Sequence, residues 1–317
     1  MKYIASLTLM LFVAASSVAQ RNDSNKFAVI VNGPGGEPEY AKQFTEWTTS
    51  LSSVLSQRYG FDPKQIRVLS EKSATAEEVK RTFTSLKTEL DTNNILFVFL
   101  IGHGSYDGKE AKFNLVGPDL SASDYNQLLT VLPTKRVIVF NMSSASGEFV
   151  KPLSAKGRIV VTATRNGQET NATRFAGFFI AALNATDGDT DQDGHTSVLE
   201  AFVYANRLTE EFYKRAGRLA TEHALIDDNG DGVGREKPEA GEGLLARATY
   251  LDSLSVDEAA ASAATGRLMK ERTRLEGEIE QLIARKGNMA EAEYEATLER
   301  LFIELAKVNR SIKQAGS

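Results

Sequence analysis

The stretch NILFVFLIGHGS, residues 94–105, decides the fold. Its central run, ILFVFLI at 95–101, contains no polar residue, and such a strand is expected to be buried on both faces. Strands of this kind belong to parallel sheets that are covered by helices. The segment GHGS follows directly, so His103 would stand between two glycines where the strand ends. Because ligands of open α/β sheets bind beyond the carboxyl ends of the strands, His103 is a candidate site residue.

Similar apolar runs alternate with helical patterns on both sides of this stretch. A capping box, Thr75 with Glu78, marks the start of one helix. This alternation predicts an α/β fold with a mostly parallel sheet and helices on both of its faces. Strands are expected at 26–33, 65–69, 136–141 and 157–164, and helices at 44–55, 75–90, 121–132, 172–183 and 197–215.

The composition is that of a globular protein, with 42% hydrophobic and 25% charged residues among 317. The net charge is −5, the pI is about 5.5, and no basic stripe is present, which argues against a nucleic-acid partner. Cysteine is absent, so no disulfide can form and stability must come from a core or from bound metal. The most nucleophilic side chain at neutral pH is therefore missing as well.

The first residues have the pattern of a secretory signal peptide. Lys2 supplies a positive start, an apolar run follows, and Ser17-Val18-Ala19 forms a cleavage site before Gln20. The alternative is a membrane anchor, but the run is short for a spanning helix, which needs about 20 residues. We therefore expect residues 1–19 to be removed, with no stable membrane insertion afterwards. The mature protein is predicted to be periplasmic or secreted.

The composition changes near residue 253, which separates a domain at 26–252 from a C-terminal segment at 255–317. Two apolar seams follow, the second with alternating spacings of three and four, and RKGNMAEAE at 285–293 separates them. They predict an antiparallel helical hairpin of coiled-coil type. The hairpin could fold against its own domain or provide a surface for self-association. The seams consist of Leu268, Leu275, Ile279 and Leu282, and of Leu298, Leu301, Leu305, Val308 and Ile312.

The loop DTDQDGHTSVLE, residues 189–200, has the ligand pattern of an EF-hand calcium loop. Glycine at position six allows the sharp turn, and a helix follows immediately. Position eight is Thr196, where an aliphatic residue is usual. Oxygen ligands favour calcium over zinc, and we prefer calcium binding to the alternative of a solvated acidic turn. The predicted ligands are Asp189, Asp191, Asp193, the backbone carbonyl of His195, Ser197 and Glu200.

A second acidic loop, DDNGDGVG, begins at Asp227. Asp227, Asn229 and Asp231 fit positions one, three and five of a calcium loop. Position twelve is Pro238, so the pattern is incomplete. Calcium binding and a simple acidic turn both remain open for this loop.

The stretch NMSSASGEF, residues 141–149, follows the strand expected at 136–141. A strand that ends in small residues and glycine can present a nucleophile, and Ser143 and Ser144 are the candidates. His103 ends a neighbouring strand. His223, in TEHALIDD, is expected to have a structural role near the second acidic loop.

The segments FVFLIGHGS, RVIVFNMSSASGEF and RIVVTATRNGQE together resemble the legumain-like C13 peptidases of the caspase-type clan. In that family a His-Gly pair ends one strand, and Cys followed by x-Ser-Gly ends the next. The resemblance covers about residues 26–235 and implies a caspase-like three-layer α/β sandwich. It also implies that the catalytic histidine and the nucleophile lie on adjacent strand ends. Aligned on Ser146-Gly147, His103 is retained and the family's cysteine falls on Ser144.

Two departures from the family bear on function. Legumains carry an arginine after the tyrosine that corresponds to Tyr40, whereas Ala41 stands here, so asparagine preference is not expected. A serine needs a base in contact and an orienting third group, which a cysteine does not. The exchange therefore favours a non-catalytic homologue that binds a peptide or protein segment in its cleft. The alternatives are an active endopeptidase that uses Ser144 and His103, and a structural calcium-binding envelope protein.

Overall fold

The computed structural model describes residues 25–185, 188–190, 195–238, 243–251 and 289–315, and parts of 267–285. The predicted signal peptide at 1–19 lies outside the described residues, as do Asp191 and Asp193 of the first acidic loop.

A six-stranded sheet forms the centre of the molecule, in the order β2-β1-β3-β7-β8-β9. Neighbouring strands are parallel except for β9, which pairs antiparallel with β8 at one edge. The prediction of an α/β fold with a mostly parallel sheet is confirmed. The strands are β1 (Lys26–Asn32), β2 (Ile66–Ser70), β3 (Ile95–Ile101), β7 (Arg136–Asn141), β8 (Arg158–Thr162) and β9 (Leu225–Asp227).

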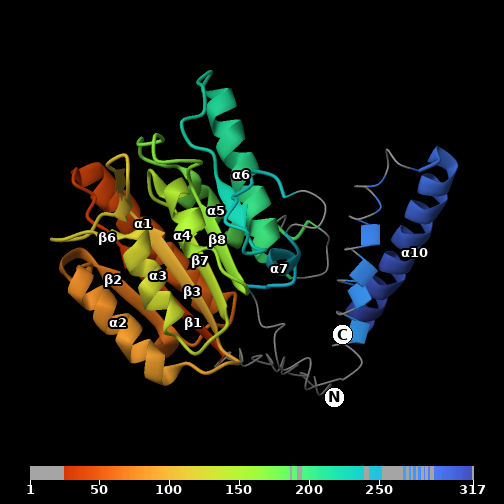
Figure 1. Ribbon diagram of the computed structural model, residues 1–317, viewed down its shortest axis with the longest axis horizontal. Helices are drawn as coiled ribbons and strands as arrows, with labels where there is room; N and C mark the ends of the chain where they lie inside the picture. Colours follow the sequence, from red (N-terminus) through yellow and green to blue (C-terminus); the bar gives the residue numbers. More distant parts are fainter. Residues whose placement is uncertain are drawn as a thin grey trace, which may run out of the picture.

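Helices cover both faces of this sheet, which makes three layers (Figure 1). One face packs against α1, α5 and α6, and the other against α2, α3 and α4. The short helix α7 contacts α6. The helices are α1 (Pro38–Gln57), α2 (Ala76–Glu89), α3 (Ala122–Thr130), α4 (Val150–Leu153), α5 (Phe175–Asn184), α6 (Val198–Arg215) and α7 (Leu244–Arg247).

Strand β3 shows why the opening stretch is apolar without interruption. Successive side chains of a strand point to opposite faces. Phe97 and Phe99 contribute to the core under α1 and α5, whereas Leu96 and Val98 contribute to the core under α2 and α3. All residues of β3 are buried. Burying a side chain of this size stabilises the fold by roughly 1.5–3 kcal/mol, so the two cores fix β3 at the centre of the sheet.

The helix starts follow local hydrogen-bonding rules. Ser121 and Asp124 form a complete capping box at the start of α3, and Ser197 and Glu200 form another at α6. At α2 the expected box is only half formed: Thr75 accepts from the Glu78 amide, but the Glu78 carboxylate pairs with Arg81 instead.

The sequence patterns missed a second, three-stranded antiparallel sheet of order β4-β5-β6. It consists of β4 (Gly104–Tyr106), β5 (Ala111–Phe113) and β6 (Leu120–Ser121). The missed strand β9 is equally short, with three residues. Strands of this length contain too few residues to show a period of two. The second sheet forms because Phe113 of β5 and Leu120 of β6 are buried in the core under α2.

A buried lysine connects the first strand, through hydrogen bonds, to a distant part of the chain. Lys26 has no exposed surface, and its Nζ donates to the carbonyls of Tyr59 at 2.8 Å and Leu251 at 3.0 Å. The ammonium also lies 4.8 Å from the centre of the Phe61 ring. A buried charge is tolerated only when polar groups of this kind surround it.

The C-terminal segment is helical. Helix α10 (Glu291–Ala315) carries Tyr294 and Leu301, which form an apolar cluster with Leu275, Ile279 and Leu282. The seams predicted from the sequence therefore meet, although Leu268 and Ile312 lie outside this cluster. Figure 1 shows α10 to one side of the sandwich. Within the described ranges, no helix is both long and apolar enough to span a bilayer.

Candidate functional site

His103 and Ser144 follow neighbouring strands at the same edge of the sheet. His103 comes two residues after the end of β3, and Ser144 three residues after the end of β7. Because Leu100 pairs with Asn141 in a parallel register, the two loops begin side by side. This placement agrees with what the resemblance implies for the two strand ends.

The His103 ring is held by one hydrogen bond and two aromatic contacts. Its Nε2 lies 3.1 Å from the carbonyl oxygen of Gly35, in the loop after β1. A carbonyl can only accept, so this bond places a proton on Nε2 and leaves Nδ1 as the available nitrogen. The rings of Tyr40 and Phe44 each contact the imidazole at a centroid distance of 5.1 Å. The imidazole is therefore orientated before any ligand binds.

The Ser144 hydroxyl is hydrogen bonded to the backbone of the residue that follows His103. Its Oγ donates to the Gly104 carbonyl at 3.0 Å and accepts from the Gly104 amide at 3.1 Å. Ser144 is only 3% exposed. A side chain at position 104 could not be accommodated, since its Cβ would lie 2.3 Å from the Ser144 carbonyl oxygen. The glycine is required by this close approach of the two loops.

Ser143 is not available as a nucleophile. It has no exposed surface, and its hydroxyl donates to Asn141 Oδ1 at 2.7 Å. Of the two serines considered from the sequence, Ser144 is therefore the one that adjoins the His103 loop.

The loop that carries Ser144 is fixed in an unusual conformation. Ala145 has φ of 53°, in the left-handed region that costs a residue with a Cβ about 1–2 kcal/mol. Its amide donates to the Glu169 carbonyl at 2.8 Å. The Ser146 hydroxyl accepts from the amides of Ala163 and Thr164 at 3.1 and 3.2 Å. These bonds hold the loop against the end of β8 and offset the backbone strain.

The geometry leaves Ser144 without a base. A serine nucleophile must pass its proton to a base in hydrogen-bond contact, but the Ser144 proton is directed to a backbone carbonyl. Within the described part of the chain, no hydrogen bond joins His103 to Ser144. The Gly104 amide, which could otherwise stabilise a developing oxyanion, is occupied by the Ser144 oxygen.

A second histidine lies closer to this loop than the sequence indicated. The Glu169 carboxylate accepts from the Arg165 amide at 2.8 Å, the His223 amide at 3.1 Å and the His223 ring at Nδ1. Glu169 is also the residue whose carbonyl holds Ala145. Glu169 and His223 are 54 positions apart, and no local pattern in the sequence connects them.

Glu222, next to His223, caps a helix. Its carboxylate accepts from the amides of Arg174 and Phe175 at the start of α5, and from the hydroxyl of Tyr213 at 2.9 Å. Burial raises the pKa of Glu222, while the bonds from these two amides act to lower it. The Glu222 carboxylate therefore connects its own segment to the start of α5 and to α6.

The structure describes the two ends of the first acidic loop, residues 189–190 and 195–200. Glu200 accepts from the Thr190 amide and hydroxyl at 2.9 and 3.0 Å with one oxygen, and from the Ser197 amide and hydroxyl with the other. Positions two and twelve of the proposed calcium loop therefore meet, with the Glu200 carboxylate turned toward the loop. Both carboxylate oxygens of Glu200 are thus bonded to the ends of the loop, and calcium binding by this loop stays a prediction.

The second acidic loop has a different organisation. Asp227 accepts from the amides of Gly230 and Gly232, and Asp231 accepts from the Val233 amide. Arg235 also binds Asp231, and this hydrogen bond is the main reason that the pKa of Asp231 is lowered to about 2. The carboxylates are thus bonded to the turn itself and to an arginine, as in an acidic turn. Among the described residues, no group of three or more acidic, histidine or cysteine side chains could hold a metal ion.

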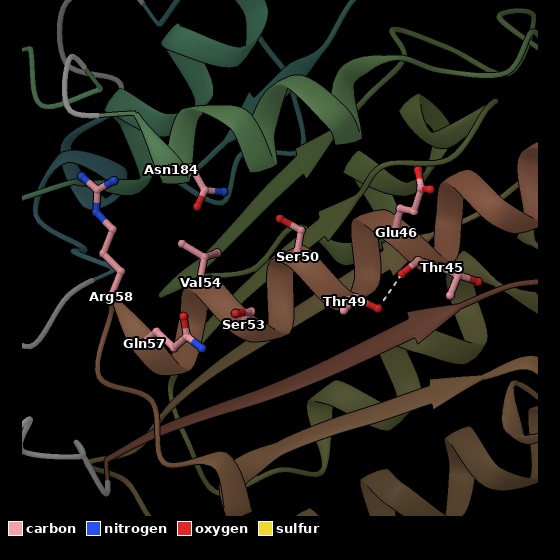
Figure 2. Close-up of a pocket in the computed structure, with 9 residues that line it drawn as sticks. All are labelled: Thr45, Glu46, Thr49, Ser50, Ser53, Val54, Gln57, Arg58 and Asn184. Atoms are coloured by element: carbon pink, nitrogen blue, oxygen red, sulfur yellow. Dashed lines mark hydrogen bonds between the residues drawn. The ribbon is translucent and has the colours of Figure 1, made fainter.

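A hollow of about 650 Å³ lies elsewhere, between α1 and the C-terminal end of α5 (Figure 2). Four of its nine lining residues carry a hydroxyl group, and the two charged side chains are Glu46 and Arg58. Arg58 donates to the carbonyl of Ala185 at 2.9 Å. Neither strand-end loop contributes to this hollow. The lining residues are Thr45, Glu46, Thr49, Ser50, Ser53, Val54, Gln57, Arg58 and Asn184.

No family model matches the chain. No curated protein matches it either. Among solved structures, the chain is similar to a structural-genomics target from Geobacter sulfurreducens, with 14% identity and a TM-score of 0.41 over 58% of this chain and 89% of that one. It is also similar to caspase-1 from Spodoptera frugiperda, with 12% identity and a TM-score of 0.44 over 66% of this chain and 88% of the caspase. Because a fold does not define an activity, the function must be inferred from the site.

Proposed function

We propose that the chain is an exported, calcium-binding homologue of the legumain-like peptidases that binds a peptide or protein segment without cleaving it. The observation that supports this proposal most directly is the pairing of Ser144 with Gly104. The Ser144 hydroxyl donates to the Gly104 carbonyl at 3.0 Å and accepts from the Gly104 amide at 3.1 Å. It makes no use of His103, which is already bonded to Gly35.

The edge strand β4 supports a peptide-binding role. It begins at Gly104, directly after His103, and pairs with β5 on one side only. An exposed strand edge can bind an extended peptide through backbone hydrogen bonds, with side-chain pockets adding specificity. Ser105 at the centre of β4 is exposed. The amide and carbonyl of Gly104 are already bonded to the Ser144 hydroxyl. A segment added to β4 would therefore pair from Tyr106 onward and lie beside the Ser144 loop.

A peptide library with a serine-directed fluorophosphonate tests the proposal. We expect wild-type protein to retain a subset of peptides, to cleave none of them, and to remain unlabelled. Ser105→Trp should lose the retained peptides because it obstructs β4. Ser50→Trp, in the hollow of Figure 2, is the matched control and should keep them.

Two results would contradict this proposal. Cleavage by the wild type would favour the alternative of an active endopeptidase with Ser144 as nucleophile and His103 as acid and base. If no peptide is retained, the alternative of a structural calcium-binding envelope protein is preferred.

Export is part of the same proposal and rests on the pattern of residues 1–19. We expect the mature protein in the periplasmic or secreted fraction, with an intact mass that corresponds to a start at Gln20. A full-length chain found in the membrane fraction would contradict the proposed cleavage and favour the anchor.

A further inference from the structure

The end of helix α6 carries an exposed basic and apolar surface that the proposed function does not use. All residues from Lys214 to Leu219 are exposed, and Leu219 is 90% exposed. We call this segment, KRAGRL at 214–219, the α6 tip. In Figure 1 the C-terminal end of α6 stands out at the top of the sandwich.

The α6 tip has a defined shape. Gly217 has φ of 62° and ends the helix in the left-handed conformation. The Arg218 amide donates to the Tyr213 carbonyl at 3.0 Å, and the Gly217 amide donates to the Lys214 carbonyl at 3.1 Å. Just beyond the tip, the Thr221 hydroxyl contacts the Tyr213 hydroxyl at 3.0 Å. The exposure of Leu219 is therefore a property of a closed, hydrogen-bonded turn.

The charge of the α6 tip is entirely positive. Lys214, Arg215 and Arg218 provide it, whereas the whole chain has a net charge of −5. Acidic side chains lie one turn earlier: Glu211 bridges Arg207 and Arg215, and Glu210 is exposed beside it. Within the described residues, neither Lys214 nor Arg218 forms an ion pair.

Aromatic side chains extend the apolar surface below the tip. Phe212 is 37% exposed and contacts the ring of Phe178 at a centroid distance of 5.9 Å. The guanidinium of Arg174 lies 5.6 Å from the centre of the Phe212 ring. The α6 tip thus combines an exposed leucine with three basic side chains, and an exposed phenylalanine lies on α6 just before it.

We propose that the α6 tip docks on an anionic lipid surface, with Leu219 entering the interface and the three cations contacting lipid headgroups. The negative surface potential of anionic lipid attracts clustered Lys and Arg side chains, and the α6 tip carries three of them. A stable protein partner would require about 800 Å² of complementary surface on each side, whereas the tip is a narrow projection. The interaction is peripheral and needs no spanning helix.

Docking would hold the strand-end site near the lipid surface. Tyr213, at the base of the tip, bonds to Glu222, and the adjacent His223 bonds to Glu169. The Glu169 carbonyl in turn holds Ala145, next to Ser144. The tip and the Ser144 loop therefore belong to one connected part of the molecule.

Cosedimentation with vesicles tests the proposal, using the chain from Gln20 onward, which contains all described residues. We expect binding to phosphatidylcholine vesicles that contain phosphatidylserine, weak binding to phosphatidylcholine alone, and loss of binding at high salt. Lys214→Gln with Arg218→Gln should weaken binding on the order of twentyfold, since each cation contributes about fivefold. Leu219→Ser should also weaken it.

The matched controls lie at another exposed position of the fold. Val131→Ser, and Lys135→Gln with Arg136→Gln, remove similar groups after α3 and should leave vesicle binding unchanged. Circular dichroism establishes that each variant is folded. Absence of binding by the folded wild type, or equal binding by the tip variants, would overturn the proposal. If soluble polyglutamate displaces the protein and Leu219→Ser has no effect, the tip recognises acidic polypeptides instead. The assay does not involve Ser144, so its failure would leave the proposed function untouched.

Discussion

Ser144→Cys is expected to react with a thiol-directed probe at a rate that depends on His103. The wild-type chain contains no cysteine, so all labelling reports the introduced thiol. A free thiol is only a few per cent ionised at neutral pH, and a neighbouring protonated histidine can lower its pKa to between about 3.5 and 7.5. We therefore expect Ser144→Cys to be labelled at least about tenfold faster than the same variant with His103→Ala.

Position 105 provides the control for accessibility. Ser105→Cys places an exposed thiol on the neighbouring strand β4, and its labelling rate should not change with His103→Ala. If Ser144→Cys reacts equally fast with and without His103, the imidazole does not influence this position. If the wild-type protein is labelled by a fluorophosphonate at Ser144, and His103→Ala abolishes this, the protein is a serine hydrolase. In the latter case the hydrogen bond from Ser144 to Gly104 would have to open before reaction.

Calcium is expected to raise the melting temperature by about 5–10 °C at one hundred times the dissociation constant. Binding to the native state alone adds about 2.7 kcal/mol at that concentration, and a domain of this size gains about 2–4 °C per kcal/mol. The residues that we expect to bind are Asp189, Asp191, Asp193, His195, Ser197 and Glu200. The measurement compares melting with calcium and with a chelator.

The variants separate calcium binding from the local structure of the loop. Glu200→Gln keeps an acceptor for the capping box at α6 but loses the oxygen that accepts from Thr190, so it should melt earlier under both conditions as well as lose the calcium shift. Asp189→Asn avoids the capping box and should lose mainly the shift. Asp231→Asn, in the second acidic loop, is the control, since Asp231 is bonded to Arg235. A wild-type protein with the same melting temperature in calcium and in chelator would show that 189–200 is an acidic turn.

The central sheet was predictable because its strands are buried on both faces. Uninterrupted apolar runs such as 95–101 and 137–140 are typical of strands covered by helices on both faces. The carboxyl ends of parallel strands meet at one edge, which places both loops there. That His103 and Ser144 lie on adjacent strand ends was implied only by the resemblance to the legumain-like family. Helix starts are less certain: the capping box expected at Thr75 and Glu78 is only half formed, whereas the complete boxes at Ser121 and Ser197 were not predicted.

The remaining parts of the site depend on contacts between distant residues. His103 meets Gly35 across 68 positions, and Glu169 meets His223 across 54. A single histidine or glutamate in a loop has no periodicity, and its partner is decided by tertiary packing. The direction of the Ser144 hydroxyl is likewise set by how closely Gly104 approaches, which the sequence indicates only through the presence of a glycine.

The buried ammonium of Lys26 has a consequence for the order in which the chain can fold. One of its acceptors, the Leu251 carbonyl, lies 225 positions later. During synthesis, the first strand would emerge long before this acceptor. Lys26 would then have to remain hydrated, since an ammonium without its polar partners is costly to bury. The first strand can therefore complete its native environment only after residue 251 has emerged, and the sandwich is expected to close as a whole once this residue is available.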